Sequence, residues 1–489
     1  MSDAREEPGG LELTPAERRE LLDVLSSFAL ARLEHLAREP AVGEVGAAGN
    51  RIAAEVSTPI PEAPLPGGPA RIVALLARAT EASLNPAGPG YLAYVPGGGL
   101  YASAVADFVA GTLNRFTGQS SAAPALSRLE ADVLAWLAAA FGYGPAARGV
   151  FTSGGSLANF AAIVAARHAR FGDSGDLRRA IAYVGGQSHH SVTKALRLAG
   201  VPSRNVRVID VDDAFRMIPG ALASRIAEDR AAGGEPFLVV AAAGTTNTGA
   251  VDPLPALAEL SARERLWLHV DGAYGGAFVL CEEGRRALVG IERADSITLD
   301  PHKGLFLPYG TGCLLARDGE ALRRAHHVGA DYLQDFDALD RDGEPPNPAE
   351  YGPELSRDFR GLRLWLPLML HGAGAFRRAL AEKLALAQQA CAGVERLIAQ
   401  GAPLELVARP QLSTIAFRLA RAPGEAADAW RRRNEALLAR IVARRRVFLS
   451  STLLRSADGP AFTLRVCVLS FRTHARAIET FLEDLAAAL

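Results

Sequence analysis

The chain has 489 residues, of which 49% are hydrophobic, and its 53 lysines and arginines nearly balance 54 aspartates and glutamates, giving a net charge of −1. A chain of this length and composition can bury a core without disulfides or metals. The near-zero charge argues against nucleic acid or an anionic membrane as partner, because such binding scales with the number of basic groups engaged.

Several features favour a cytoplasmic protein. The segment from Met1 to Glu7 lacks the basic and apolar regions of a signal peptide, and no run of 18 apolar residues occurs. The cysteines are spaced too widely for a disulfide framework or a zinc site, so we expect reduced thiols. They are Cys281, Cys313, Cys391 and Cys467.

A first helix is predicted directly after Thr14. Thr14, Pro15 and Glu17 supply an N-cap, a proline at the first helical position and the glutamate of a capping box. Apolar residues then recur every three or four positions, so this helix needs a packing partner. The apolar stripe consists of Leu22, Leu25, Ala29, Leu33 and Leu36. The stretch from Pro40 to Pro69, rich in Gly, Pro and Ala, is predicted as an irregular connection.

From about Gly90, short apolar runs alternate with helical stretches, which predicts an α/β fold with a mostly parallel sheet. A helix is predicted from Ser156 to Arg170, a long helical region after Arg360, and a smaller unit at the C-terminus. The clearest strands of the large sheet are Ile181–Val184, Val206–Ile209, Phe237–Ala242, Leu266–Val270 and Ser296–Leu299, and those of the smaller unit are Ser413–Leu419 and Phe462–Val468.

Ligands of such sheets collect at the carboxyl ends of the strands, so we follow the residues there in chain order. Thr152-Ser153-Gly154-Gly155-Ser156 leads into the Ser156 helix, where glycines permit close approach and free N–H groups favour an anion. The stretch matches neither the P-loop nor the G-x-G-x-x-G pattern, so a nucleotide is not indicated.

Two adjacent histidines, His189 and His190, follow the strand at Ile181. Neighbouring side chains usually point apart and no carboxylate stands at ligand spacing, so a metal site is not predicted. A stacking or proton-transferring imidazole is the functional interpretation, and a surface pair is the structural one.

Asp271 stands at the end of the predicted strand that begins at Leu266, and Lys303 follows the predicted strand that begins at Ser296. Asp271 precedes Gly272-Ala273-Tyr274, where small residues would let a flat ring lie against the backbone and a carboxylate would keep a ring nitrogen protonated. Lys303 lies in the turn Asp300-Pro301-His302-Lys303-Gly304; a lone lysine is usually solvated, but one in a desolvated pocket is a nucleophile towards aldehydes.

Together these motifs meet the requirements of pyridoxal 5′-phosphate (PLP), and their order resembles the group II pyridoxal-dependent decarboxylases. That family includes the aromatic-L-amino-acid and glutamate decarboxylases. The likeness runs from about Tyr91 to Arg472 and also includes Gly244-Thr245-Thr246. It implies the type I fold of PLP-dependent transferases, which is that of aspartate aminotransferase, and a homodimer whose active sites lie at the interface.

The resemblance also implies a role for each matching residue. Lys303 would bond to the cofactor aldehyde and Asp271 would pair with its ring nitrogen. The residues that would line the ring are His189, Ala273 and Thr246, and those that would hold the phosphate are Gly155, Ser156 and His302. Asp300 stands where several members of the family have asparagine. A carboxylate that faced the phosphate would repel it, so Asp300 is left out of the predicted site.

The family's lid loop corresponds to the stretch from His326 to Leu355, which ends at the resembling anchor Ser356-Arg357-Asp358-Phe359-Arg360-Gly361-Leu362. In the family, a loop tyrosine reprotonates the product. Counting back from the anchor puts Pro348 at that position, so Tyr351, three residues away, is the candidate. Because some relatives lacking this tyrosine make aldehydes with oxygen, a decarboxylating aldehyde synthase is the first alternative, and a non-catalytic PLP-binding scaffold is the second.

The predicted activity is decarboxylation of an L-amino acid to the amine and CO2, with an aromatic or other bulky substrate favoured. Tyr94 and Gly97 match the family's substrate-side segment, but Gly97 is small where aromatic-specific members carry larger residues, which enlarges the pocket or leaves room for another group. Arg465 aligns with an arginine that meets the substrate carboxylate in some members. Three parts are predicted: a helical segment at 1–89 that wraps around the partner, a large PLP-binding α/β domain at 90–375 and a small α+β domain at 376–489.

Overall fold

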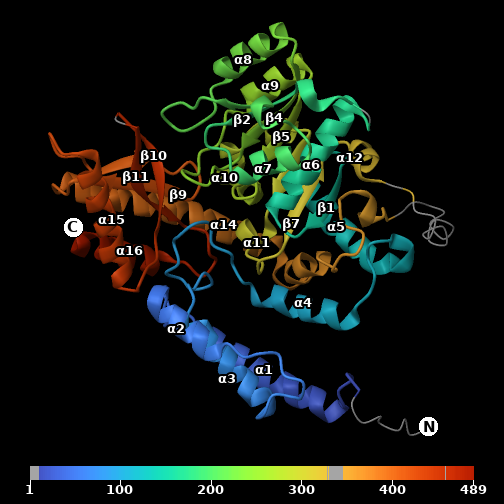
Figure 1. The fold of residues 1–489 in the computed structure, drawn as a ribbon, viewed down its shortest axis with the longest axis vertical. Coiled ribbons are helices and arrows are strands. Elements are labelled where there is room, and N and C mark those ends of the chain that lie inside the picture. Colours follow the sequence, from blue (N-terminus) through green and yellow to red (C-terminus); the bar gives the residue numbers. More distant parts are fainter. Residues whose placement is uncertain (1–9, 174, 328, 330–344, 458) are drawn as a thin grey trace.

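Two β-sheets organise the chain (Figure 1). The computed structural model describes residues 10–173, 175–327, 329, 345–457 and 459–489. The larger sheet has seven strands in the order β1-β7-β6-β5-β4-β2-β3. These are β1 Arg148–Thr152, β2 Ala180–Gly185, β3 Val206–Ile209, β4 Glu235–Ala242, β5 Trp267–Asp271, β6 Ser296–Leu299 and β7 Gly312–Ala316.

The larger sheet is mostly parallel, which confirms the predicted α/β class. Neighbours from β6 through β5, β4 and β2 to β3 run parallel, and β7 is antiparallel to both β1 and β6. Every strand except β7 therefore points the same way. As a result, the carboxyl ends of β1, β2, β4, β5 and β6 meet at one edge of the sheet.

Both faces of this sheet are buried. In β4, Val239 and Ala241 belong to one hydrophobic core, and the alternating Leu238 and Val240 belong to another. Helix α6 crosses the face that includes β4 to β7. This double burial explains why the strands are continuous apolar runs in the sequence. The helices of this region are α4 Tyr101–Leu113, α5 Pro124–Ala140, α6 Gly155–Phe171, α7 His190–Leu198, α8 Pro219–Ala231, α9 Leu254–Glu264, α10 Glu282–Ala287, α11 Pro301–Gly304 and α12 Gly319–His326.

The smaller sheet is antiparallel, in the order β10-β11-β9-β8. Its strands are β8 Leu404–Ala408, β9 Thr414–Leu419, β10 Ser450–Ser456 and β11 Gly459–Cys467, and its helices are α15 Ala427–Ala443 and α16 Ala475–Ala488. Helix α14, Gly361–Ala399, joins the two sheets and is interrupted at Gly372, whose φ of 70° is left-handed. The predicted domain boundary at residue 375 lies just after this kink.

The N-terminal helices form an elongated arm below the body (Figure 1). Helix α1, Pro15–His35, begins with the predicted capping box at Thr14 and Glu17. The arm also contains α2, Gly46–Val56, and α3, Gly68–Glu81. The prediction of an irregular connection from Pro40 to Pro69 was therefore wrong, because the Ala-rich run of α2 buries Ile52 and gains packing that outweighs its glycines.

The apolar stripe of the arm is only partly covered. Leu22 and Ala29 are exposed, Leu25 and Leu33 are half-buried, and Leu36, which follows α1, is buried. Within the described chain, helix α1 itself buries none of its residues. No helix among the described residues is long and apolar enough to cross a lipid bilayer.

Candidate active site

A cavity of about 320 Å³ lies at the carboxyl edge of the larger sheet. The ends of β1, β2, β4, β5 and β6 all contribute to it, as the parallel direction of these strands requires. Eight residues predicted from the sequence line this one cavity. They are Gly155, Ser156, His189, Thr246, Asp271, Ala273, His302 and Lys303.

Lys303 lies in the single turn of α11, which follows β6 directly. Its Nζ forms an ion pair with Oδ2 of Asp300 at 2.7 Å. The Lys303 side chain is 24% exposed and that of Asp300 only 2%. Leaving Asp300 out of the site was therefore wrong: it lines the cavity, because Pro301 starts a helical turn that brings residues 300 and 303 onto the same side.

Asp271 is held from two sides at the end of β5. Its Oδ1 accepts a hydrogen bond from the backbone N–H of Ala273 at 3.1 Å, and its Oδ2 accepts one from Nδ2 of Asn159 at 3.1 Å. Asn159 lies on α6 and is 1% exposed. These bonds fix the orientation of the carboxylate at the carboxyl end of β5.

A buried histidine completes the hydrogen-bond chain behind Asp271. His269 is fully buried, and burial lowers its pKa to about 4, so it is neutral at physiological pH. Its Nε2 lies 3.0 Å from Oδ1 of Asn159 and its Nδ1 lies 2.8 Å from Oγ of Ser296. Since Oδ1 of Asn159 can only accept, the network assigns the proton of His269 to Nε2.

The same chain reaches His189. Nδ2 of Asn159 also donates to Oγ of Ser191 at 3.2 Å, and Oγ of Ser191 lies 2.8 Å from Nδ1 of His189. The backbone N–H of Ser191 donates to that Nδ1 as well, because His189 is the N-cap of α7. The assigned tautomer therefore carries its proton on Nε2. Burial lowers the pKa of His189, so this histidine, like His269, favours the neutral form.

The backbone of Gly155 and Ser156, at the start of α6, forms a cradle in the wall of the cavity. A Cβ on Gly155 would lie 2.8 Å from Oδ2 of Asp300 and 3.1 Å from Cβ of Ala273, so only glycine fits there. The first N–H groups of the helix have no partner within it and carry its positive dipole end. His302 stands beside the cradle; its Nδ1 donates to the carbonyl of Thr311 at 2.7 Å, and burial lowers its pKa.

Tyr274 links this cavity to the smaller sheet. It follows Ala273 directly, and its hydroxyl lies 2.7 Å from Oγ of Ser413. The N–H of Ser413 and the hydroxyl of Thr414 donate to the same oxygen at 3.0 Å and 3.1 Å. Burial raises the pKa of the Tyr274 phenol, which therefore stays protonated.

The predicted substrate-side residues lie outside the lining of this cavity. Tyr94 is 56% exposed with a left-handed φ of 49°. The space beside Gly97 is filled, because a Cβ there would lie 2.7 Å from Cζ of Tyr309, whose ring also lies against His302 with centroids 5.6 Å apart. Arg465 is 2% exposed, and its Nη1 donates to the carbonyl of Tyr94 at 2.8 Å.

Tyr351 does not line this cavity. It is 9% exposed and packs in a hydrophobic core with Val150 and Leu314. It lines a different cavity of about 300 Å³ next to α5. Much of the loop that should carry the proton donor, residues 330–344, lies outside the described residues.

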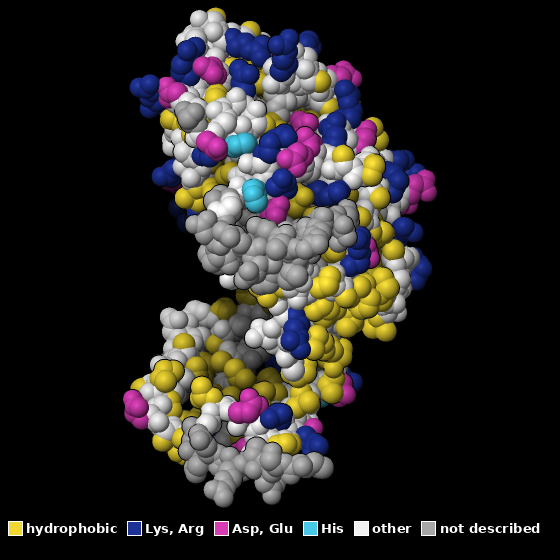
Figure 2. All heavy atoms as spheres, turned by 90° about the vertical axis from the view of Figure 1, so that its right-hand side faces the viewer, with side chains coloured by type: hydrophobic (Ala, Val, Ile, Leu, Met, Phe, Trp, Pro, Cys, Tyr) yellow, Lys and Arg dark blue, Asp and Glu magenta, His cyan; other side chains and the backbone are white. Residues whose placement is uncertain are grey.

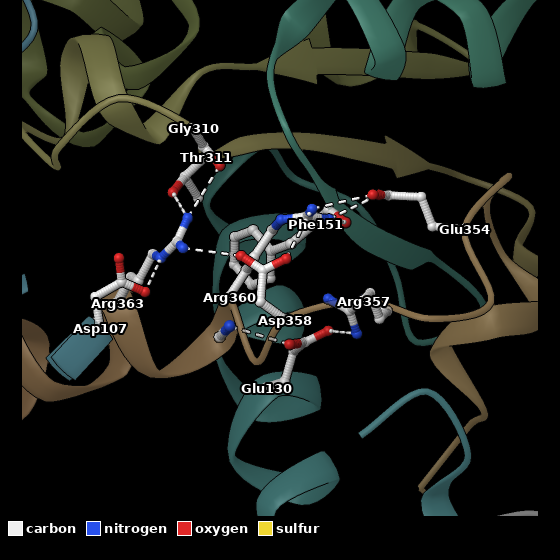
Figure 3. Close-up of polar contacts among 11 residues, drawn as sticks. Asp107, Glu130, Phe151, Gly310, Thr311, Glu354, Arg357, Asp358, Arg360 and Arg363 are labelled. Carbon is white, nitrogen blue, oxygen red and sulfur yellow. Dashed lines mark hydrogen bonds and ion pairs between the residues drawn. The ribbon is translucent and has the colours of Figure 1, made fainter. Parts of the chain in front are cut away.

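The anchor after this loop is held by a network of arginines (Figure 3). Arg357 and Glu130 form an ion pair at 2.6 Å, and each side chain is only 1% exposed. Arg360 pairs with Glu354 at 2.7 Å and points towards β1, where its Nη1 lies 3.5 Å from the carbonyl of Phe151. The base of the loop is thereby tied to the strand that leads into the cradle.

The residue that follows the anchor, Arg363, reaches the turn that holds His302. Arg363 donates to the carbonyl of Gly310 at 3.0 Å and to Oγ1 of Thr311 at 3.3 Å. It also pairs with Asp107 of α4 at 2.7 Å (Figure 3). The carbonyl of Thr311 in turn accepts from His302, so the anchor and the cavity share one hydrogen-bonded turn.

These residues fit pyridoxal 5′-phosphate. The cavity combines an amine for an aldehyde, a fixed carboxylate for a ring nitrogen and a helix start for a phosphate, lined by small residues. Sequence reasoning missed Asn159, Ser191 and Tyr309. Asn159 and Ser191 lie in helices, where the sequence pattern gave no sign of a role in the site. Tyr309 belongs to none of the motifs that were identified.

Comparison with known proteins gives a consistent result. The conserved domain of the pyridoxal-dependent decarboxylases matches residues 85–420. The aromatic-L-amino-acid decarboxylase of Bacillus atrophaeus is 38% identical over 385 residues, which cover 79% of this chain and 78% of the relative. The phenylacetaldehyde synthase of Petunia hybrida is 30% identical over 342 residues, 68% of this chain and 66% of the relative. The crystal structure of Oryza sativa TDC with PLP and tryptamine superposes with a TM-score of 0.88 at 26% identity, covering 98% of this chain and 99% of that one.

Proposed function

The chain belongs to the pyridoxal-dependent decarboxylases, and we propose that it converts an aromatic L-amino acid into the corresponding amine. It is a PLP-dependent enzyme that releases CO2 from an amino acid, so the scaffold alternative is not kept. The observation that carries the aromatic substrate is the similarity to the Bacillus atrophaeus aromatic-L-amino-acid decarboxylase over most of both chains.

Pyridoxal 5′-phosphate supplies an electron sink for the electron pair left at Cα when CO2 departs. The amine of Lys303 would hold the cofactor aldehyde, and Asp271 would keep the ring nitrogen positively charged. Asn159 and the N–H of Ala273 support this assignment, because they fix both oxygens of Asp271 before the ring arrives. His189 and Ala273 would contact the ring faces.

The remaining cofactor contacts follow from the cradle. Gly155 and Ser156 would donate backbone N–H groups to the phosphate, and His302 would stand beside it. Thr246, which lines the cavity, would lie along the ring. We keep these assignments because the residues occupy one cavity and the backbone N–H groups of Gly155 and Ser156, the first two residues of α6, have no acceptor within the helix.

Substrate contacts are assigned to the segment before α4. Tyr94 and Gly97, with Tyr309 packed against Gly97, would form the wall for the aromatic side chain. Arg465 supports the neighbouring backbone through Tyr94, and its Nη2 has no hydrogen-bond partner among the described residues. That nitrogen would meet the substrate carboxylate.

The decarboxylating aldehyde synthase stays a second candidate. The Petunia hybrida relative makes phenylacetaldehyde by name, and Tyr351 lies in a separate cavity, so no proton donor for the amine product is identified in the described part of the loop. Ammonia and peroxide measured against CO2 separate the two candidates: an amine-forming enzyme releases neither, whereas an aldehyde synthase releases both.

We also propose a homodimer in the cytoplasm, with each active site at the interface. Exposed hydrophobic side chains on the arm, such as Leu22 and Leu30 on α1 and Leu76 on α3, support a partner surface. Figure 2 shows hydrophobic side chains on the arm and on the facing part of the body, with a hollow between them. A monomeric mass in solution with full activity would contradict the dimer. The four buried, unpaired cysteines are compatible with a reducing compartment.

The deciding experiment is a substrate screen. Purified enzyme loaded with PLP is incubated with the twenty common amino acids, ornithine, diaminobutyrate and dihydroxyphenylalanine, and CO2 and amine are quantified. We expect the highest kcat/KM with an aromatic substrate and no CO2 from Lys303→Ala. Preferred turnover of an acidic or basic amino acid would refute the aromatic assignment.

A further inference from the structure

Asp300 is a buried carboxylate with an unused oxygen. Its side chain is 2% exposed. Oδ2 pairs with Nζ of Lys303, but Oδ1 has no hydrogen-bond partner among the residues that the structure describes. Because burying an unpartnered carboxylate oxygen is costly, the position calls for a group that is supplied from the cavity.

The unused oxygen faces the cradle at the start of α6. A Cβ built on Gly155 would lie 2.8 Å from Oδ2 and 3.1 Å from Oδ1 of Asp300, so both oxygens stand directly over the first residue of the helix. An anion bound to those N–H groups would therefore lie beside Asp300. Two ionised acids in such contact repel strongly, and pairs of this kind in proteins share a proton instead.

The other ionisable groups around Asp300 do not remove this conflict. The ammonium of Lys303 compensates the negative charge of Asp300 only while the amine is not bonded to the cofactor. His302 has Nε2 3.9 Å from Oδ2 of Asp300, but burial lowers its pKa, and the same holds for His189. Cys313 of β7 is buried, and burial raises its pKa, so it is an uncharged thiol.

We propose that Asp300 and the phosphate of the bound cofactor share a proton, so that Asp300 acts as a carboxylic acid that donates to a phosphate oxygen. The proton is taken up from solvent when the phosphate enters the cradle, and it is released again when the phosphate leaves. Cofactor binding is thus coupled to pH through this one residue, and an asparagine in its place removes the coupling because its amide donates without titrating.

The test uses PLP itself, whose aldehyde takes up the amine of Lys303 and so removes the free ammonium beside Asp300. Its Kd is measured by absorbance from pH 7 to 9 for the full-length enzyme and for Asp300→Asn. One extra proton taken up by the native enzyme weakens its binding relative to the variant by about tenfold per pH unit, so the ratio of the two Kd values rises by that factor. With pyridoxal, which also bonds to Lys303 but lacks the phosphate, the ratio stays constant.

The matched control is Asp295→Asn, at the other end of β6, where Oδ2 of Asp295 accepts from the N–H of Leu268 at 2.8 Å. This variant should follow the native pH dependence. A ratio for Asp300→Asn that does not change with pH, or weaker binding by this variant at every pH, overturns the proposal. Neither result depends on which amino acid is decarboxylated.

A second measurement needs no variant. The infrared difference spectrum of the native enzyme with and without PLP should gain the carbonyl band of a protonated carboxylic acid. If Asp300→Asn folds, its difference spectrum lacks that band. Absence of a new acid band in the native enzyme at pH 8 also overturns the proposal, even if the variant cannot be prepared.

Discussion

Nδ2 of Asn159 lies 3.1 Å from Oδ2 of Asp271, and this single amide joins the carboxylate to both neutral histidines of the site. Its oxygen accepts from His269, and its nitrogen also donates to Ser191 beside His189. One side chain from α6 thus helps to hold Asp271 and is linked through Ser191 to His189.

Replacing Asn159 by alanine should therefore weaken catalysis. A hydrogen bond to a charged group contributes about 1.5 to 3 kcal/mol, so we expect kcat to fall roughly 10- to 100-fold, together with weaker PLP retention. Turnover and cofactor absorbance measure the two effects. Asn205→Ala is the control, since this buried asparagine binds the carbonyl of Arg178 far from the cavity. Equal kcat in Asn159→Ala and native enzyme would show that Asp271 needs no such support.

Tyr351→Phe should leave amine production within about twofold of the native rate. The ring packs in a hydrophobic core rather than in the cavity, and phenylalanine preserves that packing. Tyr351→Ala should instead lower stability by about 3 to 5 kcal/mol in urea unfolding, as expected for a truncated aromatic core residue. A stable Phe variant that released aldehyde in place of amine would restore Tyr351 as a proton donor.

Gly97→Ala should raise KM for the substrate, because the new Cβ would meet the ring of Tyr309 at 2.7 Å. If the two residues act through this contact, the effect disappears in a Tyr309→Ala background, where the ring is gone. Gly111→Ala on α4 is the control, since no atom lies within 4 Å of its added Cβ. Additive effects of Gly97→Ala and Tyr309→Ala would argue that the ring does not shape the substrate wall.

Arg357→Met should destabilise the fold by about 3 kcal/mol or more, because it leaves Glu130 buried without its cation. The double variant with Glu130→Gln should recover part of this loss in urea unfolding. For comparison, Arg286→Met removes a pair whose side chains are 64% and 80% exposed, and it should change stability by less than about 0.5 kcal/mol. Similar losses for the two arginines would contradict a special role of the buried pair.

Acid should destabilise the enzyme through His269. Its folded pKa of about 4 lies below the unfolded value of about 6.5, so the unfolded chain binds the extra proton between these limits. The free energy of unfolding therefore decreases as pH falls through this window, by about 1.4 kcal/mol per pH unit from this group. Urea unfolding of His269→Gln between pH 7 and 5 should show a smaller decrease than the native protein. An identical decrease would mean that His269 does not titrate on unfolding.

The sequence predicted the cavity well because its residues follow consecutive strands. The bounds expected for β3 and β6 match the structure, and the parallel direction of the sheet then brings Gly155, Asp271 and Lys303 to one edge. Residues inside helices gave no such signal. Asn159 is the fifth residue of α6, and a polar residue at such a position is as typical of an exposed helix surface as of a hydrogen-bond partner for Asp271.

Other differences arose where tertiary context outweighs local pattern. Asp300 was judged by charge repulsion alone, but the turn at Pro301 brings it to Lys303, whose ammonium stabilises it. Strands β1, β7, β8 and β10 were not predicted. β1 and β7 pair with each other from distant parts of the chain, whereas β8 and β10 pair with their sequence neighbours β9 and β11, so strand pairing that a local pattern does not show determines them.

The hydroxyl of Tyr274 has a practical consequence for anyone dividing this enzyme into fragments. Its hydrogen-bond partners belong to two residues, Ser413 and Thr414, at the start of β9 and more than a hundred positions along the chain, while its neighbour Ala273 lines the cavity. A split-protein reporter cut in the 330–344 stretch would separate this phenol from these hydrogen-bond partners. Reconstitution of colour with PLP would then report directly on reunion of the two halves.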